Sequence, residues 1–152
     1  CGSLAVEVKT NRRARRVARI SSVDQLWVPE NVDLYLYYLE LDVRQGNDMT
    51  LVDKIREARE CVRQSGKGNI ADFEERLQTA GYLDAQEKNY SGTSYSVRRE
   101  IVFHVMEGFP RLVRSAIPDG LSAVKYDVEL SRCDTFRTSI ETLDIRLREQ
   151  AR

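Results

Sequence analysis

The tripeptide Glu7-Val8-Lys9 lies within an apolar stretch and places a carboxylate and an amine two residues apart. In an extended strand, side chains at this spacing point to the same face, so we expect Glu7 and Lys9 to lie side by side. Hydrolysis of a phosphodiester needs a divalent cation held by carboxylates, and a lysine can orient the attacking water or offset developing charge. The spacing therefore fits a metal-dependent hydrolytic site, but E-x-K also occurs by chance on ordinary polar strand faces.

The rest of the sequence limits the metal that such a site could hold. The only histidine is His104, and the three cysteines, Cys1, Cys61 and Cys133, are far apart and form no C-x-x-C. We therefore expect neither a zinc knuckle nor a disulfide framework, and we expect a reducing cytoplasm as the location. A metal site would have to consist mainly of carboxylates, which favour Mg²⁺ or Mn²⁺ as the cofactor.

A basic segment follows the tripeptide. The whole chain has 24 basic and 24 acidic residues, but residues 1–20 hold six basic side chains against Glu7 alone. A net charge of zero argues against a protein that coats nucleic acid non-specifically, whereas a local basic segment permits a focused phosphate contact. A solvated basic turn explains the same residues equally well. The candidate DNA-binding residues are Arg12, Arg13, Arg15, Arg16 and Arg19.

Three elements must position these side chains. Alternating apolar residues predict a strand over 4–10, and a serine N-cap followed by Pro29 predicts a short helix that carries Gln25. Residues 32–43 are almost continuously apolar at their centre, which predicts a buried central strand next to the first strand. The aromatic residues here are expected in the core rather than free for base stacking; they are Trp27, Tyr35, Tyr37 and Tyr38.

The remaining residues predict two helices and two strands. Residues 50–64 and 69–80 have helical spacing, with Thr50 and Asp53 placed as a capping box. Residues 94–106 and 121–131 alternate in polarity, and we expect them to pair as antiparallel strands. We interpret His104 as solvent-exposed, and Glu40 and Asp42 as a strand end that turns polar rather than metal ligands.

The segments VEVKT, ISSVDQL and LYLYYLELDV, in this order, resemble the second half of the PD-(D/E)XK nuclease core. The resemblance implies that Glu7 is a metal ligand, Lys9 the catalytic lysine and Gln25 an accessory active-site residue. The segment FPRLVRSAIPDGLSAVKYDVELSRC, residues 109–133, is similar to a bacterial family assigned to this superfamily, whose own function is largely unassigned. The resemblance covers essentially all of the chain but only the C-terminal portion of that family.

This resemblance implies a fold and an activity. We expect an α/β protein with a restriction-endonuclease-like mixed sheet core in residues 1–48, truncated on its N-terminal side. Residues 49–152 would form a helix-helix-strand-strand extension packed with that core. The first acidic residue of the signature belongs to the family's N-terminal region, so we expect the chain alone to be inactive. The intact protein would be a Mg²⁺-dependent DNA endonuclease of prokaryotic restriction or defence.

The alternative class is a non-catalytic DNA- or protein-binding subunit that keeps a nuclease-like or winged-helix-like shape. In a winged-helix unit the helix over 69–80 would read DNA, but its polar face is mostly acidic, so we rank that reading lower. DNA is the expected partner, with other restriction or defence proteins and a second copy of the chain as further candidates. No apolar run is long enough to span a bilayer, so no membrane partner is expected.

Overall fold

The structure is a computed structural model that describes residues 3–12, 15–27, 29, 31–66 and 69–150. The backbone forms two compact units. Unit 1 consists of Cys1–Leu41 and Val97–Arg152, and unit 2 consists of Asp42–Ser96. The predicted boundary between residues 48 and 49 stays a prediction. Within the described residues, no helix is long and apolar enough to cross a membrane.

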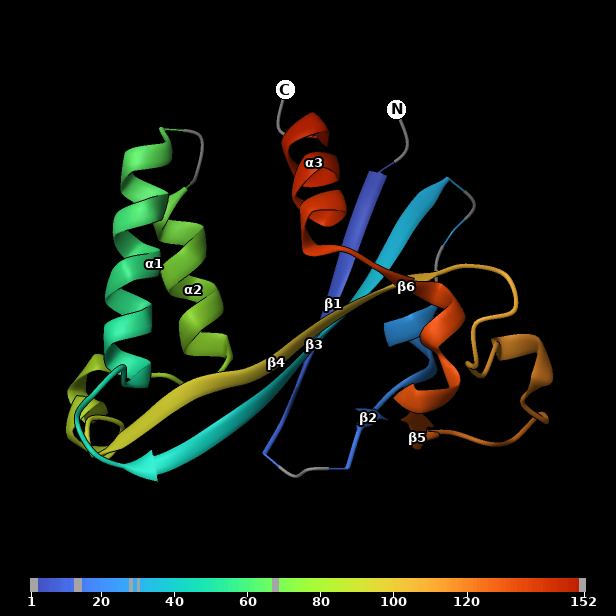
Figure 1. The fold of residues 1–152 in the computed structure, drawn as a ribbon, viewed down its shortest axis with the longest axis horizontal. Helices are drawn as coiled ribbons and strands as arrows, with labels where there is room; N and C mark the ends of the chain where they lie inside the picture. The colour runs from blue at the N-terminus through green and yellow to red at the C-terminus, as the bar shows by residue number, and fades with distance from the viewer. Residues whose placement is uncertain (1–2, 13–14, 28, 30, 67–68, 151–152) are drawn as a thin grey trace. The chain divides into compact units, whose positions relative to one another are not determined.

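A four-stranded mixed sheet runs through the chain in the order β1-β3-β4-β6 (Figure 1). Strand β1 (Ser3–Asn11) is parallel to β3 (Val32–Gln45), and β4 (Thr93–Val105) is antiparallel to β6 (Arg137–Thr138). The prediction that the first strand and the buried strand are neighbours is confirmed. The chain is thus a mixed α/β protein, and helix α3 (Ile140–Gln150) follows the last strand.

A second, two-stranded sheet corrects one prediction. Strand β2 (Val17–Ile20) pairs antiparallel with β5 (Tyr126–Glu129), so the predicted pairing of 94–106 with 121–131 is wrong. In the observed register the buried Ala18 faces the buried Val128, and Arg19 faces Asp127. Apolar burial and opposite charges both favour this pairing. The strand pair that a winged-helix unit would need is therefore not formed by β4 and β5.

The core of unit 1 explains why β3 is central. Alternate residues of β3, namely Leu34, Leu36 and Tyr38, are buried in one cluster, and Tyr35 is buried in a second cluster. Because successive side chains of a strand point to opposite faces, β3 is covered on both faces, as predicted. The first cluster also takes side chains from other elements of unit 1, which are Ala18, Ile20, Leu26, Ile101, Phe103, Val105, Phe109, Val128, Leu130 and Cys133.

Two aromatic side chains differ from their predicted environments. Tyr35 and Tyr38 are buried as predicted, but the side chain of Trp27 is 47% exposed. Trp27 follows the buried Leu26 at the end of the short helix, where the apolar anchor is already supplied by Leu26. His104 is not simply solvent-exposed, because its ring stacks on Tyr35 at 4.8 Å between centroids.

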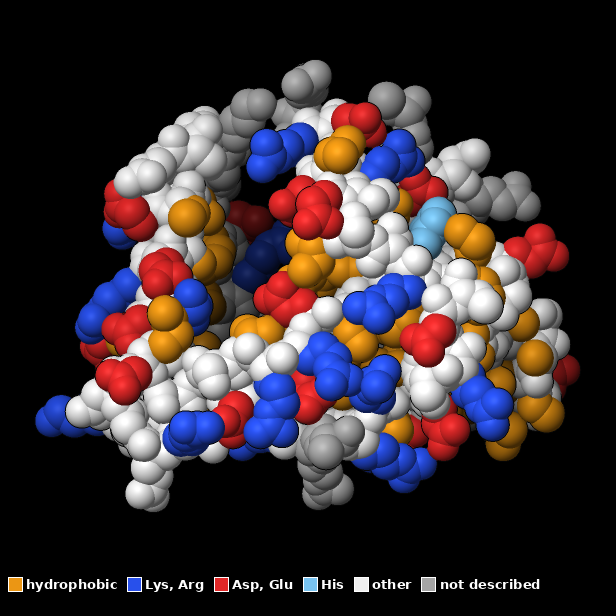
Figure 2. All heavy atoms as spheres, viewed as in Figure 1, with side chains coloured by type: hydrophobic (Ala, Val, Ile, Leu, Met, Phe, Trp, Pro, Cys, Tyr) orange, Lys and Arg blue, Asp and Glu red, His pale blue; other side chains and the backbone are white. Residues whose placement is uncertain are grey.

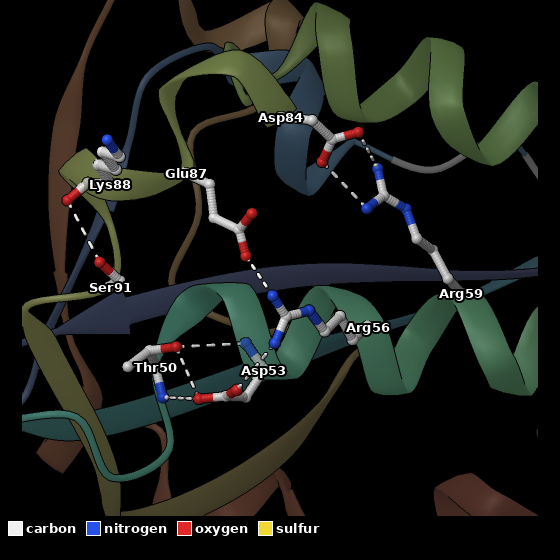
Figure 3. A network of polar contacts seen from close by, with 8 residues as sticks. All are labelled: Thr50, Asp53, Arg56, Arg59, Asp84, Glu87, Lys88 and Ser91. Atoms are coloured by element: carbon white, nitrogen blue, oxygen red, sulfur yellow. Dashed lines mark hydrogen bonds and ion pairs between the residues drawn. The ribbon is translucent and has the colours of Figure 1, made fainter.

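Unit 2 contains α1 (Leu51–Ser65), α2 (Ile70–Thr79) and the 3₁₀ helix η2 (Asp84–Asn89). The predicted capping box is present, since Thr50 Oγ1 accepts from the Asp53 N–H and Asp53 accepts from the Thr50 N–H. Arg59 of α1 donates to Asp84 of η2, and Arg56 is paired with Glu87 (Figure 3). These ion pairs hold η2 against α1.

Candidate functional site

Strand β1 places Glu7 and Lys9 on one face, as their spacing predicts. In the parallel register Glu7 lies beside Leu36 and Lys9 beside Tyr38. Ala5, two residues before Glu7, packs against the same buried cluster as Leu36 and Tyr38. Glu7 and Lys9 therefore lie on the same face of β1 as the apolar Ala5, but they reach solvent. Lys9 Nζ lies 2.9 Å from Glu7 Oε1.

The helix η1 (Val23–Leu26) brings Gln25 to Lys9. Ser22 caps this helix by accepting from the Asp24 N–H, and the buried Val23 and Leu26 fix it on the core. Gln25 Oε1 accepts from Lys9 Nζ at 2.9 Å and from the backbone N–H of Ser21 at 2.8 Å. Lys9 thus contacts both of the other residues selected from the sequence, Glu7 and Gln25.

The Lys9 ammonium is largely shielded from solvent. The Lys9 side chain is 15% exposed and that of Glu7 is 24% exposed, so both reach solvent from a largely apolar surrounding. Charges interact more strongly in such a place than in bulk water. An ammonium has three N–H donors, and the contacts with Glu7 and Gln25 account for two of them. The ammonium is therefore held in place by both residues, and the Glu7 carboxylate offsets its positive charge.

The fit of a divalent cation to these residues is incomplete. Mg²⁺ prefers oxygen ligands and is commonly held by one or two carboxylates together with waters and substrate phosphates. At the E-x-K the described residues offer one carboxylate, that of Glu7. The amide oxygen of Gln25 already accepts two hydrogen bonds and is therefore not a free oxygen ligand. Among the described residues no group of three histidine, cysteine, aspartate or glutamate side chains could hold a metal ion.

The basic segment is more strongly neutralised than its sequence suggests. Arg19 Nε donates to Asp127 at 2.8 Å, and Arg15 Nη2 donates to Glu129 at 3.2 Å, both across the β2–β5 pair. Asp127 raises the pKa of Arg19, chiefly through this hydrogen bond, and Arg19 lowers the pKa of Asp127. A phosphate at either arginine would compete with a carboxylate. Figure 2 likewise shows basic and acidic side chains interspersed on the face that it presents.

Asn11 fixes the segment that carries these arginines. Its side-chain amide donates to the carbonyl oxygens of Arg15 at 3.0 Å and Val17 at 3.3 Å. One side chain thereby ties the end of β1 to the start of β2. The side chains of Arg12 and Arg16 are exposed in this segment, and Arg13 lies outside the described residues.

Two groups near the site were not selected from the sequence. Trp27 directly follows η1, and the guanidinium of Arg114 lies 5.9 Å from the centre of its ring. Arg114 also donates to Asp24 of η1. The exposure of Trp27 was not predicted, because tryptophan side chains are usually largely buried.

Glu40 and Asp42 of β3 lie in different environments. The interpretation of Glu40 as a polar strand end is wrong in one respect, since its side chain is buried and lies 3.7 Å from Arg98 and 3.9 Å from Arg99. A buried carboxylate needs such partners because burial without them is costly. Asp42 accepts from Arg44 at 2.6 Å within unit 2.

Comparisons with known proteins identify the family of this chain. A family model described as "Putative PD-(D/E)XK family member, (DUF4420)" matches residues 1–131. No curated protein and no solved structure matches the chain. The matched region includes β1 with Glu7 and Lys9, η1 with Gln25, and both strands of the β2–β5 pair. The chain therefore belongs to the PD-(D/E)XK-assigned family DUF4420.

Proposed function

We propose that this chain forms part of a Mg²⁺- or Mn²⁺-dependent DNA endonuclease that hydrolyses phosphodiester bonds. The observation that carries the proposal is the position of the Lys9 ammonium, 2.9 Å from both Glu7 Oε1 and Gln25 Oε1. Members of PD-(D/E)XK families usually use divalent metal ions. By analogy with that superfamily the protein would act in the cytoplasm, in prokaryotic restriction or defence.

Each residue has a distinct role in this proposal. Glu7 would provide one oxygen ligand to the cation, and the cation's other protein ligands would come from outside the described residues. A bound cation would supply Lewis-acid stabilisation of the phosphate. Lys9 would orient the attacking water or stabilise charge on the phosphate, and Gln25 would fix the direction of the ammonium.

The experiment measures nicking of supercoiled plasmid by the full-length natural protein, with Mg²⁺, Mn²⁺ or EDTA. We expect cleavage that needs the cation, that is lost in Glu7→Ala and that falls roughly 100-fold or more in Lys9→Ala. Lys9→Ala should still bind DNA. The matched control is Lys88→Ala, which removes an exposed lysine of unit 2. Undiminished cleavage by a folded Lys9→Ala protein would show that the E-x-K is an ordinary polar strand face.

A second candidate is a non-catalytic DNA- or protein-binding subunit that keeps the nuclease-like shape. The observation in its favour is the single carboxylate that the described residues offer beside Lys9. Folded protein that binds DNA but does not cut it with either metal, across varied and modified DNA, would favour this candidate.

A further inference from the structure

Trp27, two residues after Gln25 in the chain, is an exposed aromatic side chain. It is the only tryptophan of the chain, and its side chain is 47% exposed. Consecutive Cα atoms are about 3.8 Å apart, so the Cα atoms of Trp27 and Gln25 are within roughly 8 Å of each other. Gln25 in turn accepts a hydrogen bond from Lys9.

The exposure of Trp27 does not come from a loose segment. The residue before it, Leu26, is fully buried, and its carbonyl oxygen accepts from Arg111 Nη1 at 2.7 Å. The Trp27 N–H donates to the carbonyl oxygen of Asp24 at 3.3 Å. The burial of Leu26 and these two hydrogen bonds fix the backbone at Trp27, which lowers the entropic cost of binding a ligand there.

Arg114 adds a positive charge to this surface. Its guanidinium carbon is 5.9 Å from the Trp27 ring centre, and its Nε and Nη2 donate to Asp24 Oδ1 at 2.8 and 2.5 Å. A guanidinium has five N–H donors, so these two bonds fix its position and leave others for an anion. An aromatic face and a fixed guanidinium together match the two parts of a nucleotide, the base and the phosphate.

A cleft with room for one nucleotide lies next to this pair. It has a volume of about 430 Å³, within the usual range for small-ligand sites. Its lining includes Ser22, Asp24, Arg114 and the loop of residues 117–124. Arg114 is common to the two, since it lines the cleft and lies 5.9 Å from the centre of the Trp27 ring.

We propose that Trp27 and Arg114 bind one unpaired nucleotide of the DNA. The base stacks on the indole, and Arg114 contacts the adjoining phosphate. Bases within a duplex are stacked on one another, so only an unpaired or extruded base can stack on Trp27. The inference rests on DNA as the substrate of the proposed function, but it does not depend on a bound metal.

The test uses the fluorescence of Trp27, because no other tryptophan contributes to the signal. The 152-residue chain is titrated in EDTA with a labelled single-stranded oligonucleotide of about eight nucleotides and with the same sequence as a duplex. Tryptophan emission and DNA anisotropy are recorded together. We expect the single strand to quench Trp27 and to bind more tightly than the duplex, with both signals giving the same Kd.

Variants separate stacking from charge. Trp27→Ala should weaken single-strand binding roughly 5- to 150-fold, whereas Trp27→Phe keeps most of the affinity. Arg114→Gln should reduce the slope of log Kd against log salt, by less than the roughly 0.7 of one full single-strand phosphate contact, because Asp24 already holds Arg114. The matched control is Arg148→Gln, which removes an exposed arginine of α3 and should leave Kd unchanged apart from a small electrostatic effect. Circular dichroism confirms that each variant is folded.

The possible failures are distinguishable. DNA binding without any change in Trp27 emission, together with wild-type affinity of Trp27→Ala, overturns the inference and leaves the nuclease proposal intact. Quenching by inorganic phosphate alone to the same extent overturns base stacking, and a folded chain that binds neither oligonucleotide overturns the inference as well. Quenching and affinity loss as expected, with undiminished cleavage by Lys9→Ala, support the nucleotide site and reject the proposed catalytic centre.

Discussion

Two cations of this chain, Lys9 in unit 1 and Arg59 in unit 2, are held among oxygen atoms in different ways. Arg59 Nε and Nη2 donate to the Glu74 carboxylate at 2.7 Å each, and Nη1 and Nη2 donate to Asp84 at 3.0 and 2.9 Å. Two carboxylates thus surround one guanidinium whose side chain is 17% exposed. Lys9 is equally shielded but has one carboxylate and one neutral amide.

The difference is one of charge balance, because two carboxylates surround Arg59 and one carboxylate pairs with Lys9. The two carboxylates compensate Arg59 fully and raise its pKa, chiefly through the hydrogen bonds from Arg59 to Glu74 and then to Asp84. Its fork of donors joins α1 to α2 and η2 and so contributes to stability. Lys9 joins only β1 to η1, and a single carboxylate, that of Glu7, balances its charge. Removing each cation in turn should therefore affect different properties.

The largest effect is expected for Lys9→Ala in the cleavage assay. We expect the rate to fall roughly 100-fold or more, because Lys9 would act on charge that develops in the transition state. Urea unfolding should change by less than about 1 kcal/mol, since the pair reaches solvent and Gln25 can bond to water instead. A large loss of stability with a proportionate loss of rate would make Lys9 a structural residue like Arg59.

Arg59→Ala should show the opposite pattern. We expect a loss of about 1 to 3 kcal/mol in the free energy of unfolding, because two carboxylates lose charged hydrogen bonds. Cleavage per folded molecule should not change. The measurement is urea denaturation followed by circular dichroism, with Arg63→Ala, an exposed arginine of the same helix, as the matched control. Equal stability of the two variants would contradict a structural role for Arg59.

The pH dependence of the Arg59 effect follows from Glu74. Arg59 lowers the pKa of Glu74 from its ordinary value of 4.5, so the folded state binds fewer protons than the unfolded state in this range. This stabilisation is present above the ordinary pKa and is lost as the pH falls through the lowered value. The stability difference between wild type and Arg59→Ala should therefore shrink between pH 7 and pH 3. A difference that stays constant would count against charge pairing.

Thr50→Ala tests the start of α1 with a smaller effect. It removes the acceptor of the Asp53 N–H and should cost about 1 kcal/mol. Thr50→Ser keeps the hydroxyl and is the matched control, expected to lose little stability. The same urea experiment measures both. If alanine and serine are equivalent, the capping bond contributes nothing measurable.

The smallest effect is expected for Arg19→Gln on DNA binding. Because Asp127 already holds Arg19, its removal should change the slope of log Kd against log salt by clearly less than the roughly 0.9 expected for one full duplex phosphate contact. Arg16→Gln, which removes an exposed arginine of the same segment, is the comparison and should give the larger change. Equal slopes would mean that Asp127 releases Arg19 to the DNA.

Local patterns were sufficient to predict several elements of both units. The strand over 4–10, the buried strand over 32–43 and the capping box of Thr50 each depend on neighbouring residues, and each is present. The contact of Glu7, Lys9 and Gln25 was also predicted, from strand period and element order.

The failures concern features that distant residues decide. Strand β2 has four residues within a basic run, so its short apolar pattern is hidden, and its partner β5 lies far along the chain. The exposure of Trp27 depends on Leu26 filling the core beneath η1, which the sequence order does not reveal. The burial of Glu40 depends on its ion pairs with Arg98 and Arg99, which follow it in the sequence only after the whole of unit 2.

The split of unit 1 around unit 2 has a consequence for synthesis of the chain. All residues of unit 2 have been synthesised once Ser96 is made. Strand β2 cannot pair with β5 until Val128, the partner of Ala18, has been synthesised. At about 5 to 20 residues per second, the wait between Leu41 and Glu129 is roughly 4 to 18 s. During this time the apolar faces of β1 and β3 lack their final cover. The nascent chain therefore exposes its proposed catalytic strand to chaperones and to aggregation before that strand can fold.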